Sequence, residues 1–327
     1  MTITNMNLLL EKAEQEGYAV PAFNINTDIQ AQAIFEAASE LKSPFIIQAS
    51  KGACIFQGLP KDPKNPDLND LLRGARRIKQ LAELVAEDYP QLEYALHLDH
   101  GSNFEVVKAC IDAGFTSVMI DGSHLQLEEN IELTKKVVEY AHPRNVTVEA
   151  ELGTLGGKNH SGSNDEIEYT KPGEVVRFVR ETNVDALAIC WGTRHGPNKF
   201  AAGKVDLRPE IIKQCYNALK EENLTCYLVS HGSSTVPQKY VEQINQHLGY
   251  VVSSGVPIKK IEEAINAGAR KINIDTDLRL AMTGAIRQTL DEKRGTIDPR
   301  DYLVPARKAM YETVKGTIVM FGSQNKI

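Results

Sequence analysis

The chain has 327 residues, of which 42% are hydrophobic and 24% are charged, so it can bury a large core and is not disordered. Its 37 Lys and Arg residues against 43 Asp and Glu residues give a formal net charge of −6. A general nucleic-acid binder or an anionic-membrane binder needs a basic surface, so this balance argues against both. It still permits one small anionic ligand.

Cysteine usage and the N-terminus favour a reducing, aqueous environment. The five cysteines are an odd number and none forms a Cys-x-x-Cys pair, so we expect no disulfide framework. The first 17 residues contain acidic side chains and only a three-leucine run, which indicates a short amphipathic helix rather than a signal peptide. No apolar stretch approaches the roughly 20 residues of a membrane span. We therefore expect a soluble cytoplasmic protein.

Short apolar runs alternate along the chain with longer amphipathic segments. The runs are rich in β-branched residues, as parallel strands covered on both faces are. The eight expected strands are 18–24, 43–50, 94–100, 116–123, 146–153, 184–192, 225–232 and 270–277. The main expected helices are 28–42, 103–113, 127–141, 172–182, 208–221 and 258–267. This alternation predicts an α/β fold, a single (β/α)8 TIM barrel over residues 1–327 with extra terminal helices, although a doubly wound open sheet also fits.

Two stretches interrupt the alternation. Residues 57–70 contain three prolines and are expected to form an exposed loop. Residues 154–171 are rich in Gly, Ser and Asn and follow the fifth expected strand. A long polar loop at the C-terminal end of a barrel strand lies where barrel enzymes carry out chemistry, so we expect an active-site lid there.

Three histidines stand at the ends of three expected strands, and each is followed by glycine. They are His100, His195 and His231, separated by 95 and 36 residues. The C-terminal ends of barrel strands meet at one mouth, so the three imidazoles are expected to converge on a divalent metal ion and leave one coordination position for substrate. Zinc is the first expectation, with cobalt, iron or manganese as alternatives.

Carboxylates accompany these histidines. Asp99 precedes His100 directly, and a nearby metal charge would keep it ionised and able to accept a proton. Glu151 and Asp121 are candidates for orienting the ligands or for an alternative metal position. Glu149 shares the strand face of Glu151 without an assigned role, and His97 is interpreted as a packing or supporting residue.

Small residues and backbone donors near the same strand ends indicate phosphate binding. The candidate donors are Gly196, Gly232, Ser233 and Ser234, together with Asn273, Asp275 and Thr276 before a helix whose N-terminus favours an anion. Barrels often bind phosphate in the loops after strands seven and eight. Lys199, Arg279 and Arg300 are the candidate cations.

Motifs spread over nearly the whole chain resemble those of the metal-dependent, class II fructose-1,6-bisphosphate aldolases. They include AFNIN (22–26), SPFIIQASKGA (43–53), HLDHG (97–101), GTRHG (192–196), NIDTD (273–277) and GSQNKI (322–327). The resemblance implies zinc-dependent, reversible cleavage of fructose 1,6-bisphosphate to dihydroxyacetone phosphate and glyceraldehyde 3-phosphate. It also implies a homodimer or homotetramer and a dependence on a monovalent cation.

The resemblance assigns roles to individual residues. His100, His195 and His231 would bind the zinc, and Asp99 would transfer the proton. The phosphate of the dihydroxyacetone half would contact Gly196, Lys199, Gly232 and Ser234. The substrate hydroxyls and phosphate would contact Asn273, Asp275 and Thr276. The other phosphate would contact Arg279 and Arg300, one of them from a neighbouring subunit, and the substrate would also lie near Asn24 and Ser50.

The chain departs from the family pattern at the mouth. Arg194 stands where the family commonly has serine, and Lys158 and Asn159 stand where the lid usually carries acidic residues. These differences leave open another ketose phosphate as substrate, a metal-dependent sugar-phosphate isomerase or epimerase, or a non-catalytic homologue. Asp275 favours fructose over tagatose, because tagatose-specific relatives often lack this carboxylate.

Overall fold

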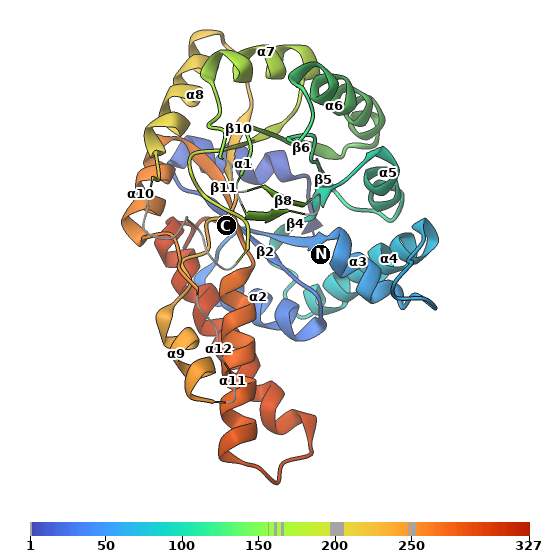
Figure 1. Ribbon diagram of the computed structural model, residues 1–327, viewed down its shortest axis with the longest axis vertical. Coiled ribbons are helices and arrows are strands. Elements are labelled where there is room, and N and C mark those ends of the chain that lie inside the picture. Colours follow the sequence, from blue (N-terminus) through green and yellow to red (C-terminus); the bar gives the residue numbers. More distant parts are fainter. Residues whose placement is uncertain are drawn as a thin grey trace.

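A closed barrel of eight parallel strands forms the centre of the computed structural model, which describes residues 2–155, 157–159, 162–164, 167–196, 206–247, 249 and 253–327 (Figure 1). The barrel strands are β2 (Val20–Asn24), β3 (Phe45–Ser50), β4 (Glu93–Gly101), β5 (Ser117–Ile120), β6 (Thr147–Leu152), β9 (Ala186–Ile189), β10 (Tyr227–Ser230) and β11 (Ala269–Ile274). Every expected strand is confirmed. Pairing of β11 with β2 closes the barrel, so the open-sheet alternative is wrong.

Helices surround the barrel. They are α1 (Met6–Glu16), α2 (Asp28–Leu41), α3 (Lys51–Gly58), α4 (Leu68–Ala86), α5 (Phe104–Asp112), α6 (Leu127–Ala141), α7 (Pro172–Thr182), α8 (Pro209–Glu221), α9 (Gln238–Gln246), α10 (Ile258–Ala267), α11 (Thr276–Glu292) and α12 (Pro299–Phe321), with a short 3-10 turn at His142–Arg144. The six main expected helices are confirmed to within one residue at each end, because their apolar faces repeat at helical spacing. A large apolar core lies between these helices and the strands.

The interior of the barrel has two halves of different polarity. Helix α1 packs against the ends at which the strands begin, where its apolar side chains join small and branched strand residues such as Val20, Ala95 and Ala188. Strand β1 (Thr2–Ile3) pairs with β4 at the same end. Toward the C-terminal ends of the strands, the inward side chains become polar and charged. Helix α1 therefore closes one end, and the polar residues gather at the other.

The two stretches that interrupt the alternation differ partly from expectation. The loop expected at 57–70 spans only 59–67, because α3 continues to Gly58 and Asp67 caps the start of α4. The two helices pack backbone to backbone, since a Cβ on Gly74 would lie 1.6 Å from the Cys54 carbonyl oxygen. Within 154–171, β7 (Gly157–Asn159) pairs antiparallel with β8 (Gly162–Asn164). Residues 156, 160–161 and 165–166 lie outside the described residues, and the lid stays a prediction.

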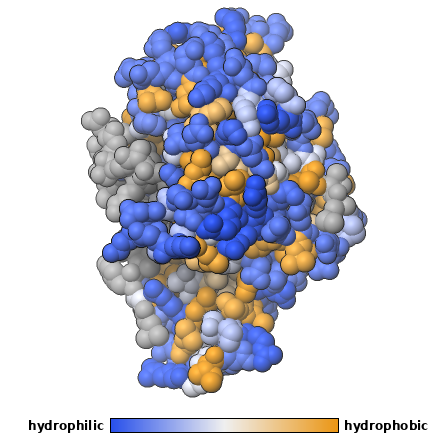
Figure 2. Space-filling model, turned by 90° about the vertical axis from the view of Figure 1, so that its right-hand side faces the viewer, coloured by the Kyte–Doolittle hydropathy of each residue, from blue (hydrophilic) through white to orange (hydrophobic). Residues whose placement is uncertain are grey.

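Helices α9, α11 and α12 form an arm that projects from the barrel, with the α11–α12 turn at its far end (Figure 1). Hydrophilic residues predominate on the face in Figure 2, and hydrophobic ones occur there in small groups. Among the described helices, none has the length and apolar character to cross a lipid bilayer. The cytoplasmic location stays a prediction.

Candidate metal centre and active site

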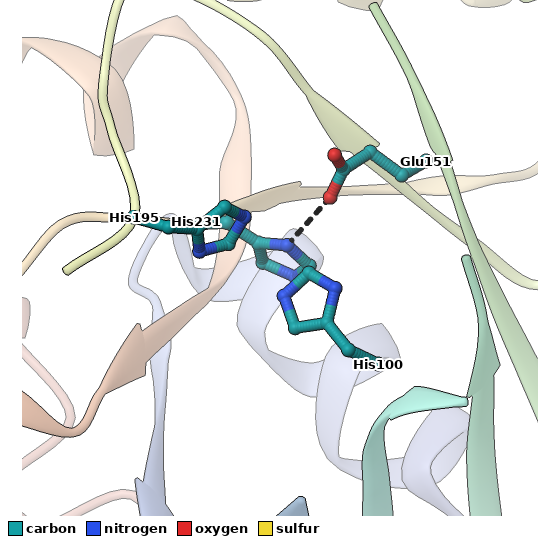
Figure 3. Close-up of side chains that lie close together, drawn as sticks. All are labelled: His100, Glu151, His195 and His231. Carbon is teal, nitrogen blue, oxygen red and sulfur yellow. Dashed lines mark hydrogen bonds and ion pairs between the residues drawn. The ribbon is translucent and has the colours of Figure 1, made fainter. Parts of the chain in front are cut away.

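Three histidines and one glutamate converge at the C-terminal ends of the strands (Figure 3). His100 lies at the end of β4, Glu151 on β6, His195 after β9 and His231 after β10. One potential ligand atom from each of the four lies within 4.8 Å of the others. The imidazole centroid of His100 is 4.6 Å from that of His195 and 4.8 Å from that of His231. The fold therefore unites the three histidines that the sequence analysis singled out.

Carboxylates fix the orientation of two of the imidazole rings. Nδ1 of His100 lies 2.8 Å from an Asp121 oxygen, which leaves Nε2 of His100 as the nitrogen that can face a metal ion. Nε2 of His231 lies 2.7 Å from Glu149 Oε1, and its Nδ1 lies 2.9 Å from Glu151 Oε2. Histidine ligands of metals usually hold their other nitrogen on such a carboxylate. Asp121 and Glu149 thus orient the rings, while Glu151 stands within the candidate ligand set.

The charges around this cluster suit a divalent cation. Burial alone would lower the pKa of His100, but Asp99 and Asp121 raise it to about 10. Burial acts in the same direction on His231, yet hydrogen bonds with Glu149 and Glu151 raise the pKa of that ring overall. Buried carboxylates around these imidazoles therefore attract positive charge, which either protons or a metal ion can supply. The nitrogen donors and the surplus of carboxylates fit a metal of the zinc type.

Asp99 is a buried carboxylate that accepts two amide hydrogen bonds. Nδ2 of Asn24 donates to its Oδ2 at 2.8 Å, and Nδ2 of Asn273 donates to its Oδ1 at 3.1 Å. Burial raises the pKa of Asp99, but His100, His231 and the other nearby donors and charges outweigh it and lower the pKa to about 2. The carboxylate is therefore ionised at neutral pH and able to accept a proton, and Oδ1 lies 3.8 Å from Nε2 of His100.

A local distortion of β4 brings Asp99 and His100 into the same site. Adjacent residues of a regular strand point to opposite faces, so the two side chains would normally diverge. His100 instead has φ of 53°, in the left-handed region, and the register between β4 and β5 shifts between Leu98 and Gly101. A non-glycine residue in this region costs of order 1–3 kcal/mol and typically occurs at functional sites. The distortion turns the imidazole toward the carboxylate's side of the strand.

The glycines expected to bind phosphate have the backbone conformations that this role needs. Gly196 has φ of 87° with open space where a Cβ would stand, and Gly232 has φ of 63°. A Cβ on Gly232 would lie 2.5 Å from the carbonyl oxygen of Arg194, so the strand-end segments approach too closely for a larger residue. Ser234 is buried nearby in the chain, and Ser50 caps α3 by accepting from the Ala53 amide at 3.2 Å.

The expected substrate cations lie in three different situations. Arg279 forms an ion pair with Asp275, with Nε 2.6 Å from Oδ1, at the start of α11 where Thr276 is the first residue. Arg300 is 85% exposed and pairs with Asp298 at the start of α12, at the far end of the arm. The single chain therefore keeps Arg300 away from the barrel mouth. Lys199 lies outside the described residues.

Two supporting residues were absent from the sequence-based expectations, and a third had no role there. Lys271 and Gln48 are buried inside the barrel, where they contact Asn273 and Asn24 respectively, and Glu149 holds His231. The signal was present in the sequence, because each of the three is a polar residue two positions before a site residue on its strand. Alternation along a strand places residues two apart on the same face.

Residues 190–194, which include the Arg194 noted in the sequence analysis, are packed into the structure. Trp191 is fully buried and its indole N–H donates to Ser230 Oγ at 2.7 Å. Thr193 Oγ1 donates to the His231 carbonyl oxygen at 2.7 Å, and Arg194 is 9% exposed. These contacts connect the segment after β9 to the segment after β10, which carries one of the candidate metal ligands.

The fold and the site together define a class: a (β/α)8-barrel protein with a candidate metal centre of three histidines and a glutamate at the end where barrel enzymes place their active sites. The chain belongs to the class II fructose-bisphosphate aldolase family, since the sequence model with the description "Fructose-bisphosphate aldolase class-II" matches residues 4–326. This agrees with the resemblance found in the sequence motifs.

Individual relatives cover the chain almost completely. It is 42% identical to a fructose-bisphosphate aldolase of Giardia intestinalis, over 99% of this chain and 94% of that protein. It is 40% identical to a fructose-bisphosphate aldolase of Helicobacter pylori, over 98% of both chains. Among solved structures, a fructose-bisphosphate aldolase of Campylobacter jejuni is similar, with a TM-score of 0.77, 25% identity and coverage of 98% of this chain and 95% of that one.

Proposed function

We propose that the protein catalyses the reversible aldol cleavage of fructose 1,6-bisphosphate to dihydroxyacetone phosphate and glyceraldehyde 3-phosphate. The observation that carries the proposal is the pairing of an ionised, doubly hydrogen-bonded Asp99 with a cluster of three histidines and Glu151. A proton acceptor beside a cation site is what aldol chemistry requires, because the C4 hydroxyl must lose a proton and the fragment left by C3–C4 cleavage carries negative charge until it is protonated. Membership of the aldolase family supports the same reaction.

We assign the metal site to His100, His195 and His231, with Glu151 as an alternative ligand and Asp121 and Glu149 as orienting carboxylates. Zinc fits best, because imidazole donors at a site with an open position are typical of catalytic zinc. When bound, the ion supplies Lewis-acid stabilisation of the charge that develops on the substrate oxygens. A monovalent cation is a further expected cofactor.

Asp99 performs the proton transfer in this proposal. Its carboxylate takes the proton from the C4 hydroxyl, the C3–C4 bond breaks, and glyceraldehyde 3-phosphate leaves. The remaining three-carbon fragment gains a proton to give dihydroxyacetone phosphate, and condensation is the reverse. Asn24 and Asn273 hold Asp99 ionised and oriented through both oxygens. Lys271 is fully buried and engaged by Glu149 and Asn273, so it is not placed to form a Schiff base.

We assign one phosphate and the hydroxyls of the substrate to residues at or after the ends of β9, β10 and β11. Gly196, Lys199, Gly232 and Ser234 bind the phosphate of the dihydroxyacetone half, and Asn273, Asp275 and Thr276 contact hydroxyls and phosphate. Asn24 and Ser50 lie near the substrate. Positive φ at Gly196 and Gly232 supports the assignment, because it lets backbone N–H groups approach an anion without a side chain between them.

Arg279 and Arg300 bind the second phosphate in this proposal, and Arg300 comes from a neighbouring subunit of a homodimer or homotetramer. Its position at the end of a projecting arm supports this, since the arm carries it away from the barrel of its own chain (Figure 1). The guanidinium is highly exposed and forms an ion pair with Asp298, which lies two residues earlier in the sequence. A bidentate arginine is well suited to a phosphate.

A panel of ketose mono- and bisphosphates tests the function. Each substrate is incubated with protein that is metal-loaded, chelator-treated, or chelator-treated and resupplied with zinc, and products are identified by coupled assays. The expected result is two triose phosphates from fructose 1,6-bisphosphate, lost with the chelator and regained with zinc. A six-carbon isomer or epimer as the product, or no zinc-restored cleavage of any ketose phosphate, contradicts the proposal. If the protein prefers a different ketose phosphate, the aldol cleavage stands and only the assigned substrate changes.

A further inference from the structure

Five buried residues form a polar layer inside the barrel, one step beneath the site. The polar layer consists of Gln48, His97, Ser117, Glu149 and Lys271, and the structure gives each of them no exposed surface. Four of them precede site residues by two positions: Gln48 precedes Ser50, His97 precedes Asp99, Glu149 precedes Glu151, and Lys271 precedes Asn273. Residues two apart on a strand share a face, so the layer points into the barrel directly under the site.

Lys271 is the buried cation of this layer and makes two contacts. Its Nζ donates to Oδ1 of Asn273 at 2.6 Å and lies 2.9 Å from Oε2 of Glu149. Nothing in the proposed reaction uses Lys271, and burying an ammonium group is costly unless partners satisfy it. Both partners of Lys271 contact the site. Asn273 donates to Asp99, the proposed proton-transfer residue, and Glu149 contacts His231, a candidate metal ligand.

The first path orients Asp99. An asparagine amide can present either its oxygen or its nitrogen to a neighbour, and only the nitrogen can donate to a carboxylate. Because Oδ1 of Asn273 is occupied by Lys271, its Nδ2 faces Oδ1 of Asp99. The other side of Asp99 is built in the same way, since Gln48 Nε2 donates to Oδ1 of Asn24 at 2.7 Å.

The second path orients His231. Glu149 uses Oε2 for Lys271 and Oε1 for Nε2 of His231. Nε2 of His231 therefore faces Glu149, which leaves Nδ1 on the side of Glu151.

We propose that Lys271 is a positioning residue that fixes Asp99 through Asn273 and His231 through Glu149 at the same time. One buried ammonium group thereby sets the geometry of the proton-transfer group and of a metal ligand on different strands. This inference rests on the proposed aldolase function for its kinetic part, whereas its metal-binding part depends only on the candidate histidine site.

The test compares Lys271→Met with Arg270→Met, a matched control on the same strand. Arg270 is also buried and ion-paired, with Nε 2.7 Å from Glu14, but it lies outside the polar layer. Four quantities are measured: kcat, KM, the free energy of unfolding, and zinc affinity by competition with a chelator. For Lys271→Met we expect kcat to fall about 10–100-fold with little change in KM, and zinc affinity to fall about tenfold or more. Arg270→Met is expected to lose stability while kcat and zinc affinity stay near wild type.

A double-mutant cycle with Asn273→Ala separates positioning from general destabilisation. At saturating zinc, where the path through His231 does not limit turnover, adding Lys271→Met to Asn273→Ala lowers kcat no further if Lys271 acts on Asp99 through Asn273. Multiplying losses, or an equal kcat loss in Arg270→Met, would overturn the path to Asp99. Unchanged or stronger zinc binding in Lys271→Met would overturn the path to His231.

A second variant keeps the test valid if Lys271→Met does not fold. The pair Glu149→Gln with Lys271→Met removes both buried charges together, which avoids an unpaired carboxylate. It keeps a hydrogen-bond acceptor for His231 but removes the donor to Asn273, so kcat is expected to fall while zinc affinity is largely retained. A wild-type kcat in this pair contradicts the inference. If the wild-type protein cleaves no fructose 1,6-bisphosphate, the proposed function is wrong. The zinc affinities of the variants still test whether Lys271 positions His231.

Discussion

Asp99 combines two properties that usually oppose each other, burial and ionisation. A buried carboxylate tends to bind a proton, yet Asn24 and Asn273 each donate to one of its oxygens, and the neighbouring positive charges lower its pKa to about 2. The same neighbours restrict its rotation, because both oxygens are engaged. Asp99 therefore has the ionisation and the fixed orientation that the proposed proton transfer needs.

Replacement of Asp99 by alanine is expected to keep zinc bound and to lower kcat by about 100-fold to 10,000-fold, because a positioned proton acceptor contributes about that much. Steady-state kinetics and metal analysis of the purified variant measure the two effects. Asp112→Ala is the control, since Asp112 lies at the end of α5 and pairs with Lys108 and Tyr140. Turnover near that of the wild type would remove Asp99 from the proton-transfer role.

Gly232→Ala is expected to destabilise the fold by about 1–3 kcal/mol, because the new Cβ would meet the Arg194 carbonyl and φ is positive. The matched control is Gly173→Ala in α7, where a Cβ meets no atom within 4 Å. Denaturant unfolding measures both variants. A Gly232→Ala protein as stable as Gly173→Ala would show that the Arg194 and Gly232 segments separate at little cost.

At the scale of elements, the end of β4 and the beginning of β9 perform different tasks. The left-handed residue His100 and the shifted register of β4 redirect an imidazole into the mouth. At the opposite end of the barrel, Asp185 stands just before β9 and connects several elements. It accepts from Asn7 of α1 at 2.7 Å and from the Val148 amide of β6 at 2.7 Å, and pairs with His142 at 2.9 Å. The C-terminal ends of the strands therefore carry the candidate site, whereas contacts of Asp185 with several elements stabilise the opposite end of the barrel.

The His142–Asp185 pair predicts a pH-dependent stability. The hydrogen bond with Asp185 raises the pKa of His142, so the pair stabilises the folded state fully below the unfolded pKa of about 6.5 and loses this contribution as pH rises through the higher folded pKa. The side chain of His142 is 31% exposed, so about 0.5–1 kcal/mol is expected. Unfolding of the wild type and His142→Gln at pH 6 and pH 9 measures it. An equal difference at both pH values would contradict the assignment.

At the scale of the whole molecule, the chain has a net charge of −6, although the proposed substrate of the site at the C-terminal strand ends is an anion. The overall charge describes mainly the outer surface, while the field at the mouth depends on local cations, backbone donors and a bound metal ion. Proton uptake and metal binding are coupled there, because the carboxylates that attract the metal also raise the pKa of His100 to about 10.

Zinc binding is expected to release protons. The pKa of His100 is raised to about 10, so at neutral pH this imidazole must lose a proton before its nitrogen binds the ion. The pKa of His231 is raised as well. Apparent zinc affinity should therefore rise from pH 6 to pH 9, by about tenfold per pH unit for each displaced proton. Titration calorimetry in buffers of different ionisation enthalpy measures the release. Binding without proton release would mean that these imidazoles are already neutral.

Subunit mixing tests the assembly. If Arg300 serves a neighbouring site, a random one-to-one mixture of Asp99→Ala and Arg300→Ala subunits regains about a quarter of wild-type activity, because half the dimers are hybrids with one complete site in two. A mixture of Asp99→Ala with Arg279→Ala is the control, since Arg279 pairs with Asp275 beside the site of its own chain. Equal recovery in both mixtures, or none in the first, would exclude the exchange of Arg300.

The sequence by itself determined the alternation of strands and helices. It also singled out the three histidines as candidate metal ligands and Asp99 as the candidate proton acceptor. Periodicity and strand-end composition are local signals, and they hold wherever the chain folds as an α/β barrel. Closure of β11 on β2 and the kink at His100 depend on pairing between distant segments, which no local pattern encodes. Only the tertiary structure showed that Lys271 lies under both Asn273 and Glu149. A buried charge takes its role from the partners that satisfy it, and those partners are brought together only when the barrel closes.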